Sequence, residues 1–210
     1  MTQSCQWQDS GYDGAVTTTP RASNDARPYH HGDLPRVLLE AAVEAIDEVG
    51  PAAVSMRDLA RRARVSHAAP AYHFGDKAGL LTAVAVDGFE RLAATLGEAY
   101  QATGSFLEVG VAYVRFAVTH RAHFEVMFRP ELYRTDDPEL VRAREQARAL
   151  LYPPAAEFTN SSDGGDDVRA GVAAWSLVHG LATLWLNHNL PPELGDDPEQ
   201  IAREVARYLF

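Results

Sequence analysis

The stretch from Val54 to Leu81 constrains the fold of this chain more than any other part of its sequence. Its letters, VSMRDLARRARVSHAAPAYHFGDKAGLL, include three side chains that can accept a hydrogen bond from the free amides at a helix N-terminus: Ser55, Ser66 and Asp76. They predict two short helices, over 56–63 and 67–74, and then a longer helix that continues to about Thr103. Two short helices joined by a tight turn are typical of a helix-turn-helix.

Apolar residues at helical spacing continue on both sides of this stretch. A preceding helix, capped by Asp33 and ended by Gly50 and Pro51, carries one apolar face: Leu34, Val37, Leu38, Ala41, Ala42, Ala45, Ile46 and Val49. The long helix should bury Leu80, Leu81, Val84, Phe89, Leu92 and Leu96. Further helices are predicted over 106–119, 120–128, 138–152, 168–189 and 198–210, with a polar loop over 159–167. No segment alternates as a strand would, so we predict an all-α fold of about nine helices.

We divide the chain into a disordered tail (1–28), a helix-turn-helix head (29–81) and a helical body (82–210). The tail is rich in Gly, Thr, Ser, Asn and Asp and has no apolar face. The net charge of −10 lies mainly in the body, which has eleven basic against nineteen acidic residues. Such a body does not prevent a separate head from binding DNA, although charge alone gives no evidence for it.

Three further features bear on location. Cys5 is the single cysteine and cannot form an internal disulfide, which fits a reducing cytoplasm. No run of about 18 apolar residues lacks charged or strongly polar groups, so a membrane partner is not expected. The N-terminus lacks the basic start and apolar core of a secretion signal. We predict a cytoplasmic protein.

The second short helix carries the chemistry of a DNA-binding surface. A helix fits the major groove, where base edges can be distinguished, and small residues at its start allow close approach. The residues expected to contact DNA are Ser55, Arg57, Arg64, Ser66, His67, Ala68, Ala69, Tyr72, His73 and Lys77. Lys77 lies in the first turn of the next helix, where its ammonium and the free amides can share a phosphate. A solvated face is an equal alternative for Arg57, Arg61, Arg62 and Arg64.

The order Ser55-x-Arg57-Asp58-Leu59-Ala60, then Val65-Ser66, then Tyr72-His73-Phe74-x-Asp76-Lys77-x-x-Leu80-Leu81 closely resembles the tetracycline-repressor (TetR) family of transcription regulators. The resemblance covers about residues 33–81 and implies that Ser66 to His73 form the recognition helix. It also implies an all-helical C-terminal domain that binds a small molecule and forms a homodimer. Trp175-Ser-Leu-Val-His179-Gly180 is similar to the Trp-His-Gly signature of one C-terminal subgroup.

The chain departs from the family pattern at three positions. Arg64 stands where the turn usually has glycine, and a non-glycine residue held at positive φ costs about 1 kcal/mol or more. Either the turn is adjusted or Arg64 is kept for a phosphate. Ala71 replaces the usual tyrosine, whose contact can pass to Tyr72. Pro70 should forfeit the first bond of the helical ladder.

In the body, eight side chains can line an apolar cavity with a few polar anchors, although core packing explains each of them individually: Tyr113, Phe116, His120, Phe124, Met127, Phe128, Trp175 and His179. The resemblance implies that the last two helices pair with those of a second copy, through Ala174, Leu181, Trp185, Ile201, Val205 and Tyr208. The predicted function is that of a regulator, expected to be a repressor, which binds double-stranded DNA as a dimer and is released by a small-molecule effector.

Two other classes of function stay open: a helical bundle that carries or transforms a ligand without binding DNA, and a protein-binding adaptor, which would leave the head unexplained. The sequence has no glycine-rich phosphate loop, Gly-x-Ser-x-Gly elbow, catalytic cysteine context or di-iron Glu-x-x-His pattern, so neither enzyme activity nor a cofactor is predicted. His120 and His123 lie three residues apart without carboxylate or cysteine companions, so no metal site is predicted.

Overall fold

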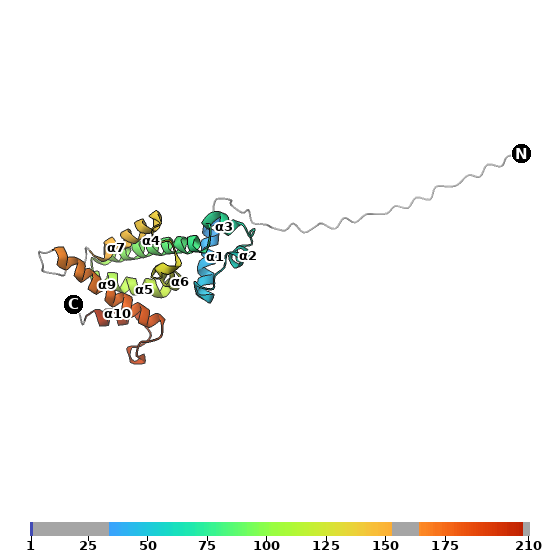
Figure 1. Ribbon diagram of the computed structural model, residues 1–210. Coiled ribbons are helices and arrows are strands. Elements are labelled where there is room, and N and C mark those ends of the chain that lie inside the picture. Colours follow the sequence, from blue (N-terminus) through green and yellow to red (C-terminus); the bar gives the residue numbers. More distant parts are fainter. Residues whose placement is uncertain (2–33, 153–163, 208–210) are drawn as a thin grey trace. The chain divides into compact units, whose positions relative to one another are not determined.

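The computed structural model describes Met1 and residues 34–152 and 164–207. These residues form nine α-helices and two short 3₁₀ helices (Figure 1), in chain order α1 (Leu34–Val49), α2 (Met56–Arg62), α3 (Ala69–Phe74), α4 (Lys77–Thr103), α5 (Phe106–Thr119), α6 (Arg121–Met127), η1 (Pro130–Leu132), α7 (Pro138–Leu151), α9 (Gly164–Leu186), η2 (Pro192–Leu194) and α10 (Pro198–Ala206). The described ranges contain no strand, and the predicted all-α class is confirmed.

All of the described helices belong to one compact unit, Gly32–Phe210. The predicted tail, with Cys5, lies outside the described residues apart from Met1, as does the predicted cap Asp33. The predicted boundary between head and body, at residues 81 and 82, falls inside α4. None of the described helices is long and apolar enough to cross a membrane.

Of the three helix caps predicted within Val54–Leu81, two are confirmed. The Ser55 hydroxyl accepts a hydrogen bond from the Asp58 amide at the start of α2, and the Asp76 carboxylate accepts one from the Gly79 amide at the start of α4. The predicted end of α1 is also confirmed, because Gly50 takes the left-handed conformation with φ 76° and its amide closes on the Ile46 carbonyl.

The predicted cap Ser66 is wrong. Helix α3 begins at Ala69 and has no side-chain cap; Ser66 contributes only its carbonyl, which accepts from the Ala69 amide at 3.0 Å. Pro70 explains the later start, because proline favours the first turn of a helix, where no ladder bond is available to its nitrogen. The expectation that Pro70 forfeits a ladder bond is therefore also wrong, and its side chain is buried.

Smaller corrections concern the ends of other elements. The expectation that Val49 lies on the buried face of α1 is wrong, because this residue is 54% exposed. Helix α9 begins at Gly164, so residues 164–167 are helical rather than part of a loop, and it ends at Leu186. The rest of the predicted loop, 159–163, lies outside the described residues, as do 208–210 at the predicted end of the last helix. Helix α6 is one residue shorter at each end than predicted.

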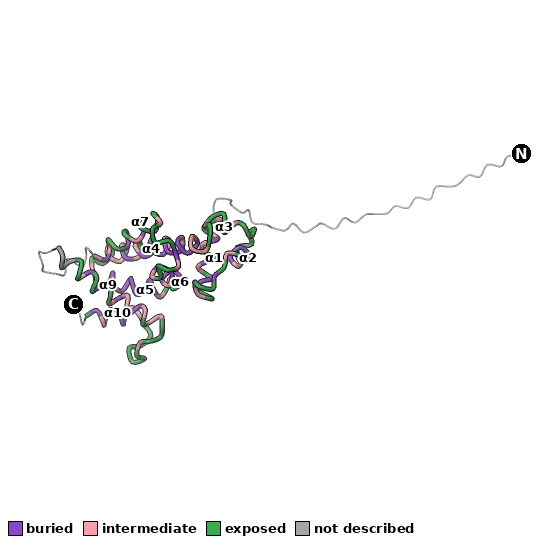
Figure 2. The backbone as a smooth tube through the Cα atoms, viewed as in Figure 1, coloured by how far each residue is buried: buried purple, intermediate pink, exposed green. Residues whose placement is uncertain are grey.

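The core runs from the head into the body along α4. Near its start, Leu80, Leu81 and Val84 are buried together with Leu38 and Ile46 of α1. Further along, all the apolar positions predicted for this helix are buried, and α4 packs against α5, α6 and α7. Figure 2 shows buried positions recurring along α4 and α5. One long helix thus contributes to the interior of both head and body.

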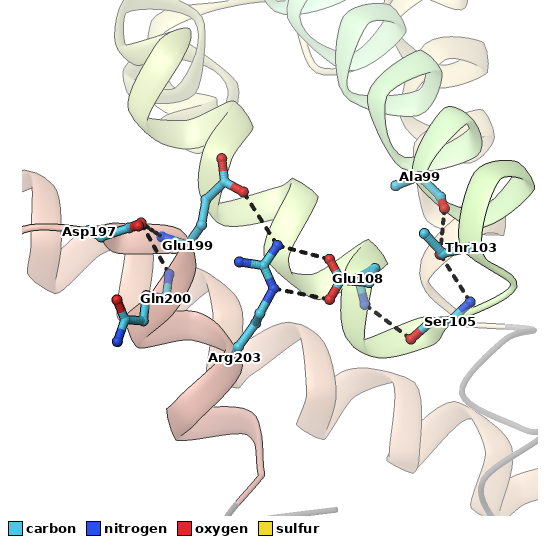
Figure 3. Close-up of polar contacts among 8 residues, drawn as sticks. All are labelled: Ala99, Thr103, Ser105, Glu108, Asp197, Glu199, Gln200 and Arg203. Carbon is cyan, nitrogen blue, oxygen red and sulfur yellow. Dashed lines mark hydrogen bonds and ion pairs between the residues drawn. The ribbon is translucent and has the colours of Figure 1, made fainter.

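An ion pair fixes α10 against α5 (Figure 3). The Arg203 guanidinium donates two hydrogen bonds, each of 3.0 Å, to the two carboxylate oxygens of Glu108. This contact holds the pKa of Glu108 below its usual range. Ser105 caps α5 through the Glu108 amide, and Asp197 caps α10 through the amides of Glu199 and Gln200. The caps and the two-pronged pair therefore set the register between the helices.

Replacing two glycines with alanine, one inside α4 and one at its C-terminal end, should change the free energy of unfolding in opposite directions. Gly104 ends the helix at φ 61°, so Gly104→Ala should lower the free energy of unfolding by about 1 kcal/mol. Gly97 lies inside the helix, and a Cβ there would meet only Leu150 at 3.8 Å, so Gly97→Ala should raise it by about 0.5–1 kcal/mol. Urea unfolding followed by circular dichroism measures both. Equal effects of the two substitutions would contradict the assignment of Gly104 as a left-handed cap.

Candidate nucleic-acid interface and small-molecule cavity

Helix α2 is fastened to α1 by one arginine. Arg62 donates two hydrogen bonds to the Glu48 carboxylate, at 3.0 and 2.7 Å, and one to Asp58 at 2.7 Å, and its side chain is only 22% exposed. Hydrogen bonds from Arg62 are the main reason that the pKa values of Glu48 and Asp58 lie below their usual range. The outward position expected for Arg62 is therefore wrong. Its role is instead to join the first two helices of the head.

The turn between α2 and α3 keeps its tight geometry despite lacking glycine. Arg64 adopts the left-handed conformation with φ 55°, and the Val65 amide closes the turn on the Ala60 carbonyl at 3.0 Å. Of the two alternatives for this position, adjustment of the turn is therefore excluded. Within the described part of the chain, neither Arg64 nor Arg57 is paired with a carboxylate, and both are exposed. Two uncompensated guanidinium groups thus lie on the surface of the head.

Helix α3 presents its polar side chains to solvent. Pro70 is buried and Phe74 packs partly against the core, while Tyr72 and His73 are exposed, Tyr72 to 86%. Their rings meet edge to face, with centroids 5.1 Å apart. Among the other predicted contact residues, Ser55, Ser66, His67 and Ala68 are exposed and Ala69 is half-buried. The exposed set occupies the α2–α3 turn and one side of α3.

Lys77 reaches back across the head. Its ammonium donates to the Ala52 carbonyl, in the loop between α1 and α2, at 2.5 Å, and its side chain is half-buried. In this position it closes the α1–α2 loop onto the start of α4. Contact between Lys77 and a phosphate stays a prediction. It requires the ammonium either to bind the phosphate while still bonded to the Ala52 carbonyl or to leave that carbonyl for the phosphate.

The segment after η1 joins the body to the start of α4. The Arg134 amide donates to the Thr82 hydroxyl at 3.0 Å, and its guanidinium donates to the Asp76 carboxylate at 3.0 Å. Asp76 is the cap of α4 and lies two residues after the end of α3. The Gly79 amide and then Arg134 hold the pKa of Asp76 below its usual range. Arg134 therefore bonds to the residues that position the recognition helix.

The body contains a cavity of about 520 Å³ between α4, α5, α6, α7 and α9. Its lining consists of Phe89, Leu92, Tyr113, Met127, Phe128, Pro130, Tyr133, Val141, Arg144, Glu145, Ala147, Arg148, Leu151, Tyr152 and Trp175. This volume is in the range of sites for small organic ligands. Four of the predicted lining residues are among them: Tyr113, Met127, Phe128 and Trp175.

The other four predicted lining residues belong to the packing around the cavity. Phe116 and Phe124 are buried in the core, and the His120 ring stacks on Phe116 with centroids 4.8 Å apart. His179 lies against Phe124 and Phe128. The assignment of these four to the lining is wrong, because an aromatic cluster shows that residues are inside without showing which of them border an empty space.

The wall of the cavity formed by α7 was not predicted from the sequence. Arg144 and Arg148 lie one helical turn apart, with Glu145 and Tyr152 nearby, and all four line the cavity. The available signal was the apolar spacing of the same helix, where Val141 and Leu151 border the same space. From the sequence alone, a charged residue that lines a cavity cannot be distinguished from one that faces solvent.

A hydrogen-bonded triad lies behind the cavity. The Trp175 Nε1–H donates to the Tyr113 hydroxyl at 3.1 Å, and this hydroxyl lies 2.9 Å from His179 Nδ1. The Tyr113 hydroxyl accepts from Trp175 and can donate to or accept from His179 Nδ1, depending on which imidazole nitrogen carries the proton. Burial raises the pKa of Tyr113 and lowers that of His179, so both groups are held neutral.

His120 and His123 do not form a metal site. His123 is buried, and its Nε2 contacts the Asp87 carboxylate at 2.8 Å, which joins α6 to α4. The His120 Nδ1 contacts the Thr119 hydroxyl at 2.9 Å. In the described ranges, no cluster of three or more His, Cys, Asp or Glu could hold a metal ion.

The structure corrects half of the predicted interface between copies. Ala174, Leu181 and Ile201 are buried within the chain, at 6%, 8% and 1% exposure, so they pack in its own core. Trp185 and Val205 are half-buried, and Tyr208 lies outside the described residues. The opposite side of α9 carries a mainly apolar strip formed by Val168, Val172, Ser176, Gly180 and Leu184, of which Gly180 is half-buried and the others are exposed.

Two family models match this chain. The model for bacterial regulatory proteins of the tetR family matches residues 38–84, and that for the tetracyclin repressor-like C-terminal domain matches residues 106–209. These ranges contain the helix-turn-helix and nearly all of the body beyond α4. The chain belongs to the TetR family of transcriptional regulators. The similarity of Trp175–Gly180 to one subgroup stays a prediction.

Individual relatives agree with this assignment. An HTH-type transcriptional repressor of Mycobacterium tuberculosis is 38% identical over 69 residues, which are 33% of this chain and 37% of the repressor, so the chain matches little more than a third of that protein. The HTH-type transcriptional regulator BetI of Escherichia coli is 29% identical over 189 residues, covering 83% of this chain and 91% of BetI.

Solved structures share the fold. A protein of unknown function from Rhodococcus sp. RHA1 is 32% identical, with a TM-score of 0.73 over 87% of this chain and 96% of its own. The TetR family regulator PfmR from Thermus thermophilus is 22% identical, with a TM-score of 0.60 over 82% of this chain and 96% of its own. Family membership confirms the prediction of a regulator rather than an enzyme, and the enzymatic alternative is set aside.

The buried imidazole of His179 makes stability depend on pH. Its pKa lies below the ordinary value because burial penalises the charged form, and unfolding therefore takes up a proton. Stability is then complete above about pH 6.5 and declines as the pH falls from there towards the lower pKa of the folded state. The pKa of His120 is lowered in the same direction, also mainly by burial.

We therefore expect the urea midpoint of the protein to fall between about pH 7.5 and 5.5. His179→Gln keeps an acceptor for Tyr113 but cannot titrate, so its profile should be flatter, and adding His120→Gln should flatten it further. Unfolding curves at several pH values measure this. Profiles that stay parallel in all three proteins would show that neither imidazole is responsible.

Proposed function

We propose that this chain is a repressor that binds a palindromic DNA operator as a homodimer in the cytoplasm and releases it when a small molecule occupies the cavity. The observation that carries the proposal is the exposed polar side of α3, within a helix-turn-helix of a TetR family member. The M. tuberculosis relative is named a repressor, which supports repression as the output.

The head offers two kinds of contact. Tyr72, His67 and His73 supply aromatic and polar groups where a helix in the major groove meets base edges. Arg57 and Arg64 are exposed cations with no carboxylate partner in the described residues, which suits them to backbone phosphates. The strain retained at Arg64 is explained if its charge is used in DNA binding.

The apolar strip on α9 supports dimerisation. Val168, Val172 and Leu184 are 48%, 42% and 44% exposed on the side of the helix that faces away from the chain's own core. A Cβ added to Gly180 would meet nothing within 4 Å, so another backbone can approach closely there. A two-fold pair of heads predicts two half-sites about one helical turn apart, roughly 34–36 Å.

Ligand response is supported by the position of the segment after η1. Tyr133 lines the cavity and its hydroxyl donates to the Met127 carbonyl at 2.7 Å, while Arg134 bonds to Asp76 and Thr82. A molecule that prefers one arrangement of this segment therefore also favours one position of α3.

DNA binding can be tested by selecting bound fragments from the genome and measuring their affinity at several salt concentrations. Arg64→Asn retains a residue that tolerates the left-handed turn but removes the charge, so it should weaken binding to all sequences and reduce the salt slope by about 1. Tyr72→Ala should change sequence preference at one position, by about 1–3 kcal/mol. Arg142→Gln, on the body, is the control and should have no effect. Failure to recover any fragment would refute the proposal.

The interface between copies has a separate test. Leu184→Asp places a charge in the apolar strip and should raise the dimer dissociation constant at least about tenfold. Val49→Asp changes an apolar residue of the head that is somewhat more exposed than Leu184, at 54% against 44%, and it should leave the dimer intact. Light scattering distinguishes the 23.0 kDa chain from a particle of twice that mass. A wild-type protein that stays monomeric at micromolar concentration would exclude this interface.

A further inference from the structure

Among the lining residues that the structure describes, all formal charges come from one wall. Helix α7 contributes Arg144, Glu145 and Arg148, whereas no described side chain of α4, α5, α6 or α9 that borders the space is charged. Arg144 is half-buried, and Glu145 and Arg148 are exposed, so the charged groups lie towards the open side. A molecule that fills the cavity therefore meets polar groups at one end and apolar surface along the rest of its length.

The other walls of the cavity offer a ligand few free hydrogen-bonding groups. The Tyr113 hydroxyl is occupied by Trp175 and His179, and the Tyr133 hydroxyl donates to the Met127 carbonyl. Apolar and aromatic side chains such as Phe89 make up most of the rest of this surface. This part of the cavity favours a hydrocarbon or aromatic body, because a buried polar group without a partner is unfavourable.

The charges on the α7 wall are not balanced. Two guanidinium groups face one carboxylate, and the nearest approach of Arg148 to Glu145 is 3.7 Å, beyond hydrogen-bond distance. Arg144 uses an Nη2 hydrogen bond to the Thr135 carbonyl at 3.1 Å, which leaves other N–H groups of its guanidinium available. The Arg148 guanidinium lies 4.9 Å from the centre of the Tyr152 ring, which holds it near the opening.

We propose that the effector of this regulator is a small amphipathic molecule with one anionic head group and an apolar body. The head group binds Arg144 and Arg148, whose forked donors match the oxygens of a carboxylate or phosphate. The body extends towards Phe89, Phe128 and Trp175. The inference rests on the proposed function only in taking this cavity as the effector site. A cationic ligand on Glu145 is disfavoured, because an arginine lies on each side of that residue along the wall.

The test uses calorimetry on the full-length protein with four probes that share one body: 6-phenylhexanoate, 6-phenylhexyl phosphate, 6-phenylhexan-1-ol and 6-phenylhexylamine. Either anion should bind at least about tenfold more tightly than the alcohol, with the amine weakest. The stronger of the two anions identifies the head group. Arg148→Gln and Arg144→Gln should each weaken the anion about tenfold without affecting the alcohol. Glu145→Gln should leave anion binding unchanged or strengthen it.

Arg142→Gln is the matched control, because Arg142 lies on the same helix but does not line the cavity. Equal binding of acid and alcohol, or tightest binding of the amine with loss in Glu145→Gln, would overturn the proposal. Release of DNA by the same probes is measured separately. An anion that binds through Arg144 and Arg148 but leaves the DNA complex intact would support the ligand class and refute the effector role.

Discussion

Helix α4 is buried near both of its ends, against different partners. Leu80 and Leu81 pack with α1 in the head, and Leu92 and Leu96 pack among the helices of the body. A helix is rigid over this length because each ladder bond is closed within one turn. Helix α3, the proposed recognition helix, is joined to the beginning of α4 at Asp76. The proposed response to a ligand therefore requires that movement of the body reach α3 through the start of α4.

The head tolerates one strained residue because its surroundings are fixed. The hydrogen bond from the Val65 amide to the Ala60 carbonyl closes the turn in which Arg64 has positive φ, and Pro70 lies in the first turn of α3, where it needs no ladder bond. Strain at this turn costs about 1 kcal/mol, which is small beside the burial of Leu59 and Leu38 in the head. The Arg62 contacts to α1 add a directional restraint. The result is a turn whose backbone follows the helix-turn-helix pattern although its sequence does not.

The sequence predicted what depends on neighbours along the chain, and it failed where tertiary neighbours decide. The caps Ser55 and Asp76, the stop at Gly50 and the end of the long helix at Thr103 are local, and each was found where expected. Both sides of α9 are apolar, so spacing alone could not show that Ala174 and Leu181 face inward while Val172 and Leu184 face outward. The cavity-lining arginines of α7 were missed for a related reason. A charged residue is assigned to solvent unless the space beside it is known.

The two adjacent residues Tyr133 and Arg134 have a consequence for how such a regulator can evolve. Tyr133 lines the cavity, and Arg134 forms a hydrogen bond with Asp76, the N-terminal cap of α4. The Arg134–Asp76 pair is exposed and screened by solvent, so it contributes little to stability, yet coupling between sites needs only about 1–3 kcal/mol. In the proposed mechanism, variation at this pair therefore changes the effector concentration at which DNA is released while leaving the ligand, the operator and the fold unaltered. Sensitivity becomes a trait that selection can adjust independently of specificity.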